Sequence, residues 1–84
     1  MSSTAVSREL LAQFVVDMLA HIGVKRSEIV PDALFDDLGV DSLDVTELGA
    51  KVKREFEIDL VPRDFEDAVR VQDALAIIYA KAGL

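Results

Sequence analysis

The chain has 84 residues and is acidic, with nine lysine and arginine residues against sixteen aspartate and glutamate residues and a formal net charge of -7. This balance disfavours binding to nucleic acid or to anionic membrane surfaces and favours basic protein partners. Cysteine is absent, so there is no disulfide framework and nothing in the composition indicates secretion. The length suits one domain over residues 1–84, which buries roughly 60–65% of the surface that its unfolded chain would expose.

The sequence shows neither a membrane span nor an export signal. No apolar run approaches the ~20 residues that a membrane-spanning helix needs. The opening residues, Met1 to Thr4, lack the basic and then apolar order of a signal peptide. We therefore expect a cytoplasmic protein.

The first predicted element is an amphipathic helix that ends near Gly23, a residue suited to the position after a helix. Its apolar residues recur at i, i+4, i+7 spacing and are expected to face the core: Leu11, Val15, Met18 and Ile22. Three hydroxyl residues are candidate N-caps: Ser3, Thr4 and Ser7.

A long connection is predicted over residues 24–40. Pro31 restricts the residue before it to extended conformations and keeps the first helix from continuing. Four apolar residues are expected to pin this connection onto the core: Ile29, Leu34, Phe35 and Leu38.

The next helix begins after Gly39, with Asp41 or Ser42 as its N-cap. At about 100° per residue, one side of this helix is apolar and faces the core. That side carries Val45, Leu48, Val52 and Phe56. The opposite side faces solvent and carries Leu43, Glu47, Ala50 and Arg54. Leu43 is thus an apolar residue on the exposed face, one step after Ser42.

Two further helical segments follow. A short one covers Arg63 to Val69, with Pro62 at its first position, where a missing N–H costs nothing. The closing helix ends before Gly83 and carries an apolar stripe: Val71, Ala74, Leu75, Ile78 and Ala82.

Ser42 is the main candidate for a functional residue. It lies at a helix start between two acids, where free backbone N–H groups and the positive end of the helix dipole suit a covalently attached phosphate. A nucleophile would also need a base, and the single histidine, His21, lies on another helix. Val40 and Asp44 replace the glycines of an esterase elbow. The acid run fails the calcium-loop pattern, and no Cys/His set exists for zinc, so no metal site is expected.

The run Asp41-Ser42-Leu43-Asp44-Val45-Thr46-Glu47-Leu48 resembles the Asp-Ser-Leu signature of acyl carrier proteins. The likeness extends to Glu55-Phe56 at the end of the same helix and to Val71-Gln72 at the opening of the last one. It implies a small four-helix antiparallel bundle with a long first loop and a short third helix. It also implies that a phosphopantetheinyl transferase attaches 4'-phosphopantetheine from coenzyme A to Ser42. The residues expected to bind partner enzymes are Asp41, Leu43, Glu47, Ala50 and Arg54.

This chain departs from the family pattern at three places. Relatives usually carry threonine where Arg70 stands, and loss of that capping hydroxyl would cost about 0.5–2 kcal/mol. Gly49 replaces a larger apolar residue, which indicates either close packing against another segment or room for an acyl chain. Fatty-acid carriers continue acidic along the second helix, whereas this chain has Lys53 and Arg54 there.

The sequence therefore predicts a stand-alone, monomeric acyl carrier protein that performs no catalysis itself. It would carry acyl thioesters between acyl-loading, condensing and other enzymes of fatty-acid or polyketide biosynthesis, in a specialised pathway. A peptidyl or aminoacyl carrier protein is the alternative within the family. The alternative from another class is an acidic helical adaptor with no prosthetic group, in which Ser42 is an ordinary cap.

Overall fold

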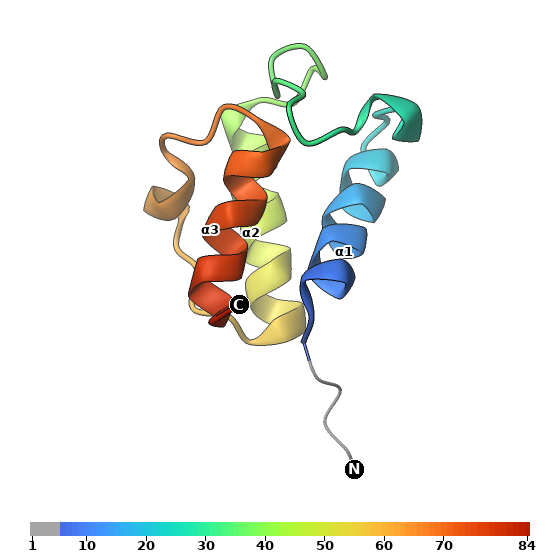
Figure 1. The fold of residues 1–84 in the computed structure, drawn as a ribbon. Helices are drawn as coiled ribbons and strands as arrows, with labels where there is room; N and C mark the ends of the chain where they lie inside the picture. The colour runs from blue at the N-terminus through green and yellow to red at the C-terminus, as the bar shows by residue number, and fades with distance from the viewer. Residues whose placement is uncertain (1–5) are drawn as a thin grey trace.

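The computed structural model describes residues 6–84, which contain three α-helices and two 3₁₀ turns. The helices are α1 (Arg8–His21), α2 (Ser42–Phe56) and α3 (Val71–Ala82), and the turns are η1 (Arg26–Glu28) and η2 (Pro62–Phe65). Figure 1 shows that the connection between α1 and α2 crosses one end of the helices. The all-α expectation is confirmed for these residues, and none of their helices is long and apolar enough to cross a membrane.

The predicted four-helix antiparallel bundle is wrong in two respects. Residues 63–69 do not form a third α-helix, because so short a segment does not offset the cost of helix nucleation, and only the turn η2 forms there. In addition, α3 runs in the same direction as α2, since residues 57–70 return the chain to the end where α2 begins (Figure 1). Both helices run antiparallel to α1. Accordingly, the Tyr79 hydroxyl near the end of α3 donates to the carbonyl of Arg8 at the start of α1, at 3.4 Å.

The ends of α1 agree with the capping residues that the sequence offers. Ser7 is the N-cap, and its Oγ accepts a hydrogen bond from the Leu10 N–H at 3.1 Å. The other two candidates, Ser3 and Thr4, lie outside the described residues. At the other end Gly23 has φ +109°, a conformation that residues with a Cβ rarely adopt.

The turn η1 is fastened to α1 by a polar cluster around Asp17. Its Oδ1 lies 2.9 Å from Arg26 Nη1 and accepts a second hydrogen bond from Gln13 Nε2 at 3.0 Å. The Arg26 hydrogen bond, followed by that from Gln13, lowers the pKa of Asp17 below its ordinary value. All of these side chains are exposed, so the cluster orients the connection without belonging to the core.

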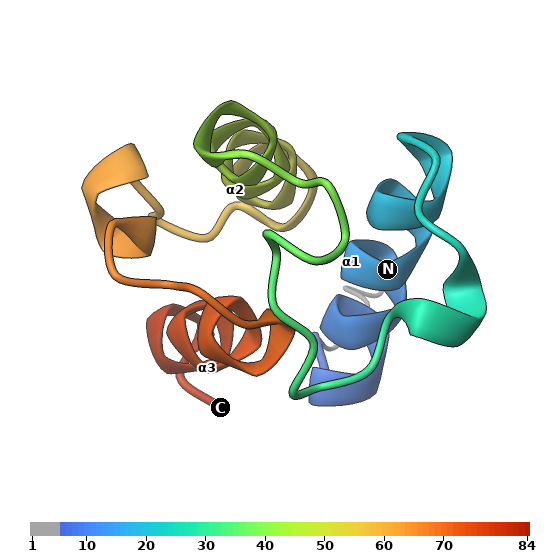
Figure 2. The same ribbon diagram turned by 90° about the horizontal axis from the view of Figure 1, so that it is seen from above.

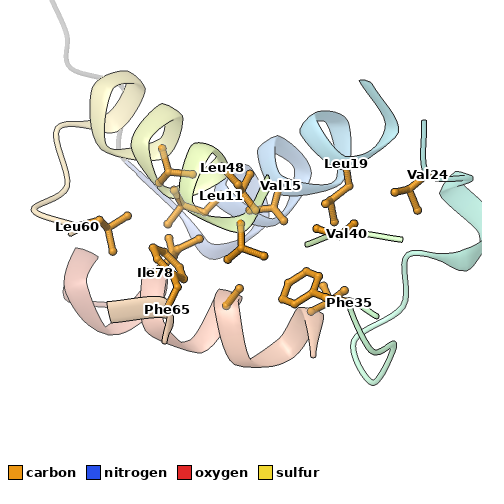
Figure 3. Close-up of a cluster of buried hydrophobic side chains, with 14 of the residues drawn as sticks. Leu11, Val15, Leu19, Val24, Phe35, Val40, Leu48, Leu60, Phe65 and Ile78 are labelled. Atoms are coloured by element: carbon orange, nitrogen blue, oxygen red, sulfur yellow. The ribbon is translucent and has the colours of Figure 1, made fainter. Parts of the chain in front are cut away.

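The core lies between the helices. The α1 helix packs against both α2 and α3, and η2 contacts the same two helices on the side away from α1 (Figure 2). Each helix contributes three residues or more to the buried cluster, and the connections complete it with Val24, Phe35, Val40, Ile58, Leu60 and Phe65 (Figure 3). At the edge, the rings of Phe14 and Phe56 meet edge to face with their centroids 5.1 Å apart.

The connection between α1 and α2 is pinned by three of the four residues expected to do so. Phe35 is buried in the core, and Ile29 and Leu38 are partly buried against it. Leu34 instead lines a surface groove that is described below.

Backbone carbonyls replace the missing capping hydroxyl at the start of α3. The N–H groups of Val71 and Gln72 donate to the carbonyls of Ala33 and Pro31, at 3.0 and 2.8 Å. The Arg70 guanidinium donates to a third carbonyl of the same segment at 2.7 Å. The helix therefore begins at Val71, and the connection is held to the end of the molecule where α2 also begins.

Candidate functional site

The start of α2 is fixed by two acids that cap each other. Asp41 is the N-cap, with extended backbone, and its Oδ1 accepts from the Asp44 N–H at 2.9 Å. In return Asp44 Oδ2 accepts from the Asp41 N–H at 3.3 Å. Of the two candidate caps that the sequence offered, Asp41 holds the position, and Ser42 becomes the first residue of the helix. The Ser42 side chain is thus left free of a structural role.

Ser42 is exposed and lies on the rim of a groove with a volume of about 710 Å³. The groove is built from three segments that are distant in sequence: the end of the α1–α2 connection, the first turns of α2, and the chain from η2 to α3. Its apolar lining includes Leu34, Val40, Val45, Phe65, Ala68 and Val69. Sequence reasoning did not identify these residues as one surface, because local periodicity carries no information on contacts between such distant segments.

The local chemistry at Ser42 suits a phosphodiester. The Asp44 and Val45 N–H groups are used, donating to the side chain and carbonyl of Asp41. Among the hydrogen bonds of residues 6–84, none uses the N–H groups of Ser42 or Leu43. These two donors at the positive end of the helix dipole are available to a phosphate oxygen carried by Ser42.

The described part of the site has neither a histidine nor a metal-binding cluster. The groove is lined by no histidine, and His21 is the last residue of α1. Within residues 6–84 no three His, Cys, Asp or Glu side chains come close enough together to hold a metal ion. The groove therefore offers Ser42 no histidine base, and its titratable lining residues are the carboxylates Asp36, Asp41 and Glu66.

The exposed face of α2 has the arrangement that the helical wheel predicts. Val45, Leu48 and Val52 are buried, whereas Leu43 is 64% exposed. Glu47, Ala50 and Arg54 are exposed as well and continue the face down the helix. The ion pairs formed within residues 6–84 join Arg26 to Asp17 and Lys81 to Asp64, so none involves the bases of α2.

Gly49 lies where α2 meets η2. A Cβ built on Gly49 would come 2.5 Å from Cε2 of Phe65, so the ring occupies the space that a larger residue would need. Of the two interpretations that the sequence left open, close packing is therefore confirmed, because the ring of Phe65 and not free space for an acyl chain lies directly against Gly49.

Comparison with known proteins identifies the family of the chain. Residues 13–78 match the family model described as a phosphopantetheine attachment site. The chain is 42% identical over 76 residues to an acyl carrier protein of Solidesulfovibrio magneticus, an alignment that covers 89% of this chain and 94% of that protein. It is 40% identical over 74 residues to an acyl carrier protein of Nitratidesulfovibrio vulgaris, covering 87% and 93% respectively. An adaptor without a prosthetic group is thereby excluded: the chain belongs to the acyl carrier protein family, whose members are non-enzymatic carriers with a covalent 4'-phosphopantetheine.

Proposed function

We propose that Ser42 is the attachment residue and that the single carrier domain conveys acyl groups as thioesters between biosynthetic enzymes. The observation that carries this proposal is the position of Ser42 as an exposed first residue of α2, beside a mutual Asp41–Asp44 cap and on the rim of the groove. A separate phosphopantetheinyl transferase forms the phosphodiester at the Ser42 hydroxyl from coenzyme A. The terminal thiol of the arm supplies the group that a chain without cysteine lacks.

The test is intact-mass analysis after incubation with coenzyme A and a broad-specificity transferase. The parent should gain one phosphopantetheine, and Ser42→Ala should gain none. Ser42→Ala should also unfold at nearly the parental temperature, because the side chain is exposed and makes no hydrogen bond within the described residues. Ser27→Ala, at another exposed serine, is the matched control and should be modified like the parent. Modification that persists in Ser42→Ala would overturn the assignment.

The exposed face of α2 is the proposed partner surface, comprising Asp41, Leu43, Glu47, Ala50 and Arg54. The N-terminal part of this face is acidic, and its C-terminal part is basic, with Lys53 beside Arg54. Charges at the rim of an interface act mainly on association rate and on the choice of partner. We therefore assign this carrier to a specialised fatty-acid or polyketide pathway, whose enzymes present an acid opposite Arg54. The carrier would act as a monomer and meet acyl-loading and condensing enzymes in turn.

A further inference from the structure

Phe65 lines both the groove beside Ser42 and a second, smaller hollow. The second hollow has a volume of about 180 Å³ and is lined by Gly49, Ala50, Leu60 and Val61 among others. The two hollows share three lining residues, Thr46, Pro62 and Phe65, which together form the wall between them. Of these, Phe65 is the one whose side chain is buried in the core.

Phe65 fits against α2 because the facing residue is glycine. A Cβ at position 49 would clash with Cε2 of the ring at 2.5 Å and would lie in tight contact with Cζ and Cδ2, at 3.1 and 3.2 Å. Phe65 is 6% exposed and projects from η2 toward the interior, where Figure 3 shows it among the core side chains. The interior route from Ser42 toward Leu60 is thus filled by a ring that packs against the helix backbone.

The turn that carries Phe65 is fastened at both of its sides. Asp64 Oδ2 accepts from the Val61 N–H at 2.9 Å, and Asp64 Oδ1 lies 3.6 Å from Lys81 Nζ at the end of α3. Pro62 fixes the backbone at the first position of the turn. These contacts hold Phe65 in the wall and oppose its displacement by a guest chain.

We propose that Phe65, seated on Gly49, limits the length of the acyl chain that this carrier shelters, so that it protects short acyl groups and leaves the ends of long ones in solvent. The proposal rests on the proposed attachment at Ser42. An acyl chain borne on an arm at Ser42 is tethered to the rim of the groove and can bury its first carbons against the apolar side chains there. The buried Phe65 ring, which lines both hollows, keeps further carbons out of the second one.

The experiment measures thermal unfolding as a function of acyl length. The apo protein is loaded from acyl-coenzyme A thioesters, from acetyl to palmitoyl, by a broad-specificity transferase, and intact mass verifies each product. Each methylene buried in a domain of this size raises the unfolding temperature by up to about 3–6 °C. In the parent the rise should stop at a short chain, and in Phe65→Leu it should continue to longer chains. Phe35→Leu is the matched control, because Phe35 is equally buried and lines the same groove but does not border the second hollow.

The outcomes separate this proposal from the one on which it rests. Failure of loading at Ser42 would overturn both. Successful loading with an unfolding temperature that is independent of length in the parent, or that rises without a break up to palmitoyl, would overturn the length limit alone. The length limit would also be overturned if the unfolding temperature stops rising at the same acyl length in the parent and in Phe65→Leu. The length limit would be established if the acyl length at which the unfolding temperature stops rising increases in Phe65→Leu and is unchanged in Phe35→Leu.

Discussion

Asp41 and Asp44 each accept a hydrogen bond from the backbone N–H of the other, at 2.9 and 3.3 Å, and this reciprocal cap begins α2 at Ser42. The shorter bond is the one that Asp41 accepts. Asp41→Ala should therefore lower the free energy of unfolding by about 0.5–2 kcal/mol, measured by urea denaturation. Asp41→Asn retains an acceptor and should lose less. Asp37→Ala removes a nearby exposed acid outside the cap and should leave stability unchanged, and equal losses in all three variants would contradict the assignment of the cap.

Gly49→Ala should destabilise the fold, although alanine has the higher helix propensity. The propensity gain is up to about 1 kcal/mol, whereas overpacking a core typically costs about 1–3 kcal/mol. The added Cβ would lie 2.5 Å from Cε2 of Phe65, so overpacking prevails. Combining Gly49→Ala with Phe65→Leu should restore part of the loss relative to the sum of the two single variants, because the residues are in contact. A higher unfolding temperature for Gly49→Ala, or strict additivity, would show that the ring does not press on the helix.

The Asp17–Arg26 pair gives a prediction on pH. Because hydrogen bonds from Arg26 and then Gln13 lower the folded-state pKa of Asp17 below its ordinary value of 3.8, the pair stabilises the fold above that pH. The stabilisation is lost as pH falls through the lowered folded-state pKa. NMR titration of Arg26→Met should show the pKa of Asp17 rising toward the ordinary value. Lys25→Met removes a neighbouring base and should leave that pKa in place.

Leu43 and Leu48 lie about 1.4 turns apart on α2, on different faces of the helix, and should respond differently to truncation. Leu43 is 64% exposed, so Leu43→Ala should change stability by less than about 0.5 kcal/mol while slowing modification by the transferase. Leu48 is 4% exposed, and Leu48→Ala should cost about 2–5 kcal/mol. Transferase kinetics and urea denaturation of both variants provide the check. Loss of stability in Leu43→Ala comparable to that in Leu48→Ala would remove Leu43 from the partner face.

Periodicity in the sequence was sufficient to predict α1, α2 and the last helix, because each has a repeating apolar side. It was insufficient for residues 63–69, where a single buried residue, Phe65, decides the packing and no repeat exists. The direction of α3 depends on the path of residues 57–70, which local pattern does not encode. Likewise Gly49 is ambiguous until the residue facing it is known.

The same distinction holds at the site. Ser42 and the exposed face of α2 follow from one helix and could be predicted from its sequence. The groove could not, because Leu34 and Val69 meet beside Ser42 only after the connection is bound to the start of α3. The connection is held there by main-chain groups, including the Phe35 N–H, which donates to the Val69 carbonyl at 2.9 Å. Main-chain hydrogen bonds can form with almost any residue type, so the sequence does not indicate them.

The bases of α2 give the last prediction. Lys53 and Arg54 are exposed and take part in no ion pair within the described residues, including with Glu57 one turn on, so their charge is available to a partner. An enzyme with a basic docking surface should be repelled by them, and the effect should weaken as salt screens it. We therefore expect Lys53→Glu with Arg54→Glu to raise kcat/KM for loading by the malonyl-transferring enzyme of general fatty-acid synthesis, most strongly at low salt. The same double substitution should impair loading by the cognate enzyme. Lys25→Glu with Arg63→Glu makes an equal charge change outside α2, at exposed bases that form no ion pair within the described residues, and should leave the rates near those of the parent. Equal kcat/KM for the parent and the α2 variant with both enzymes would show that these bases are only solvated surface.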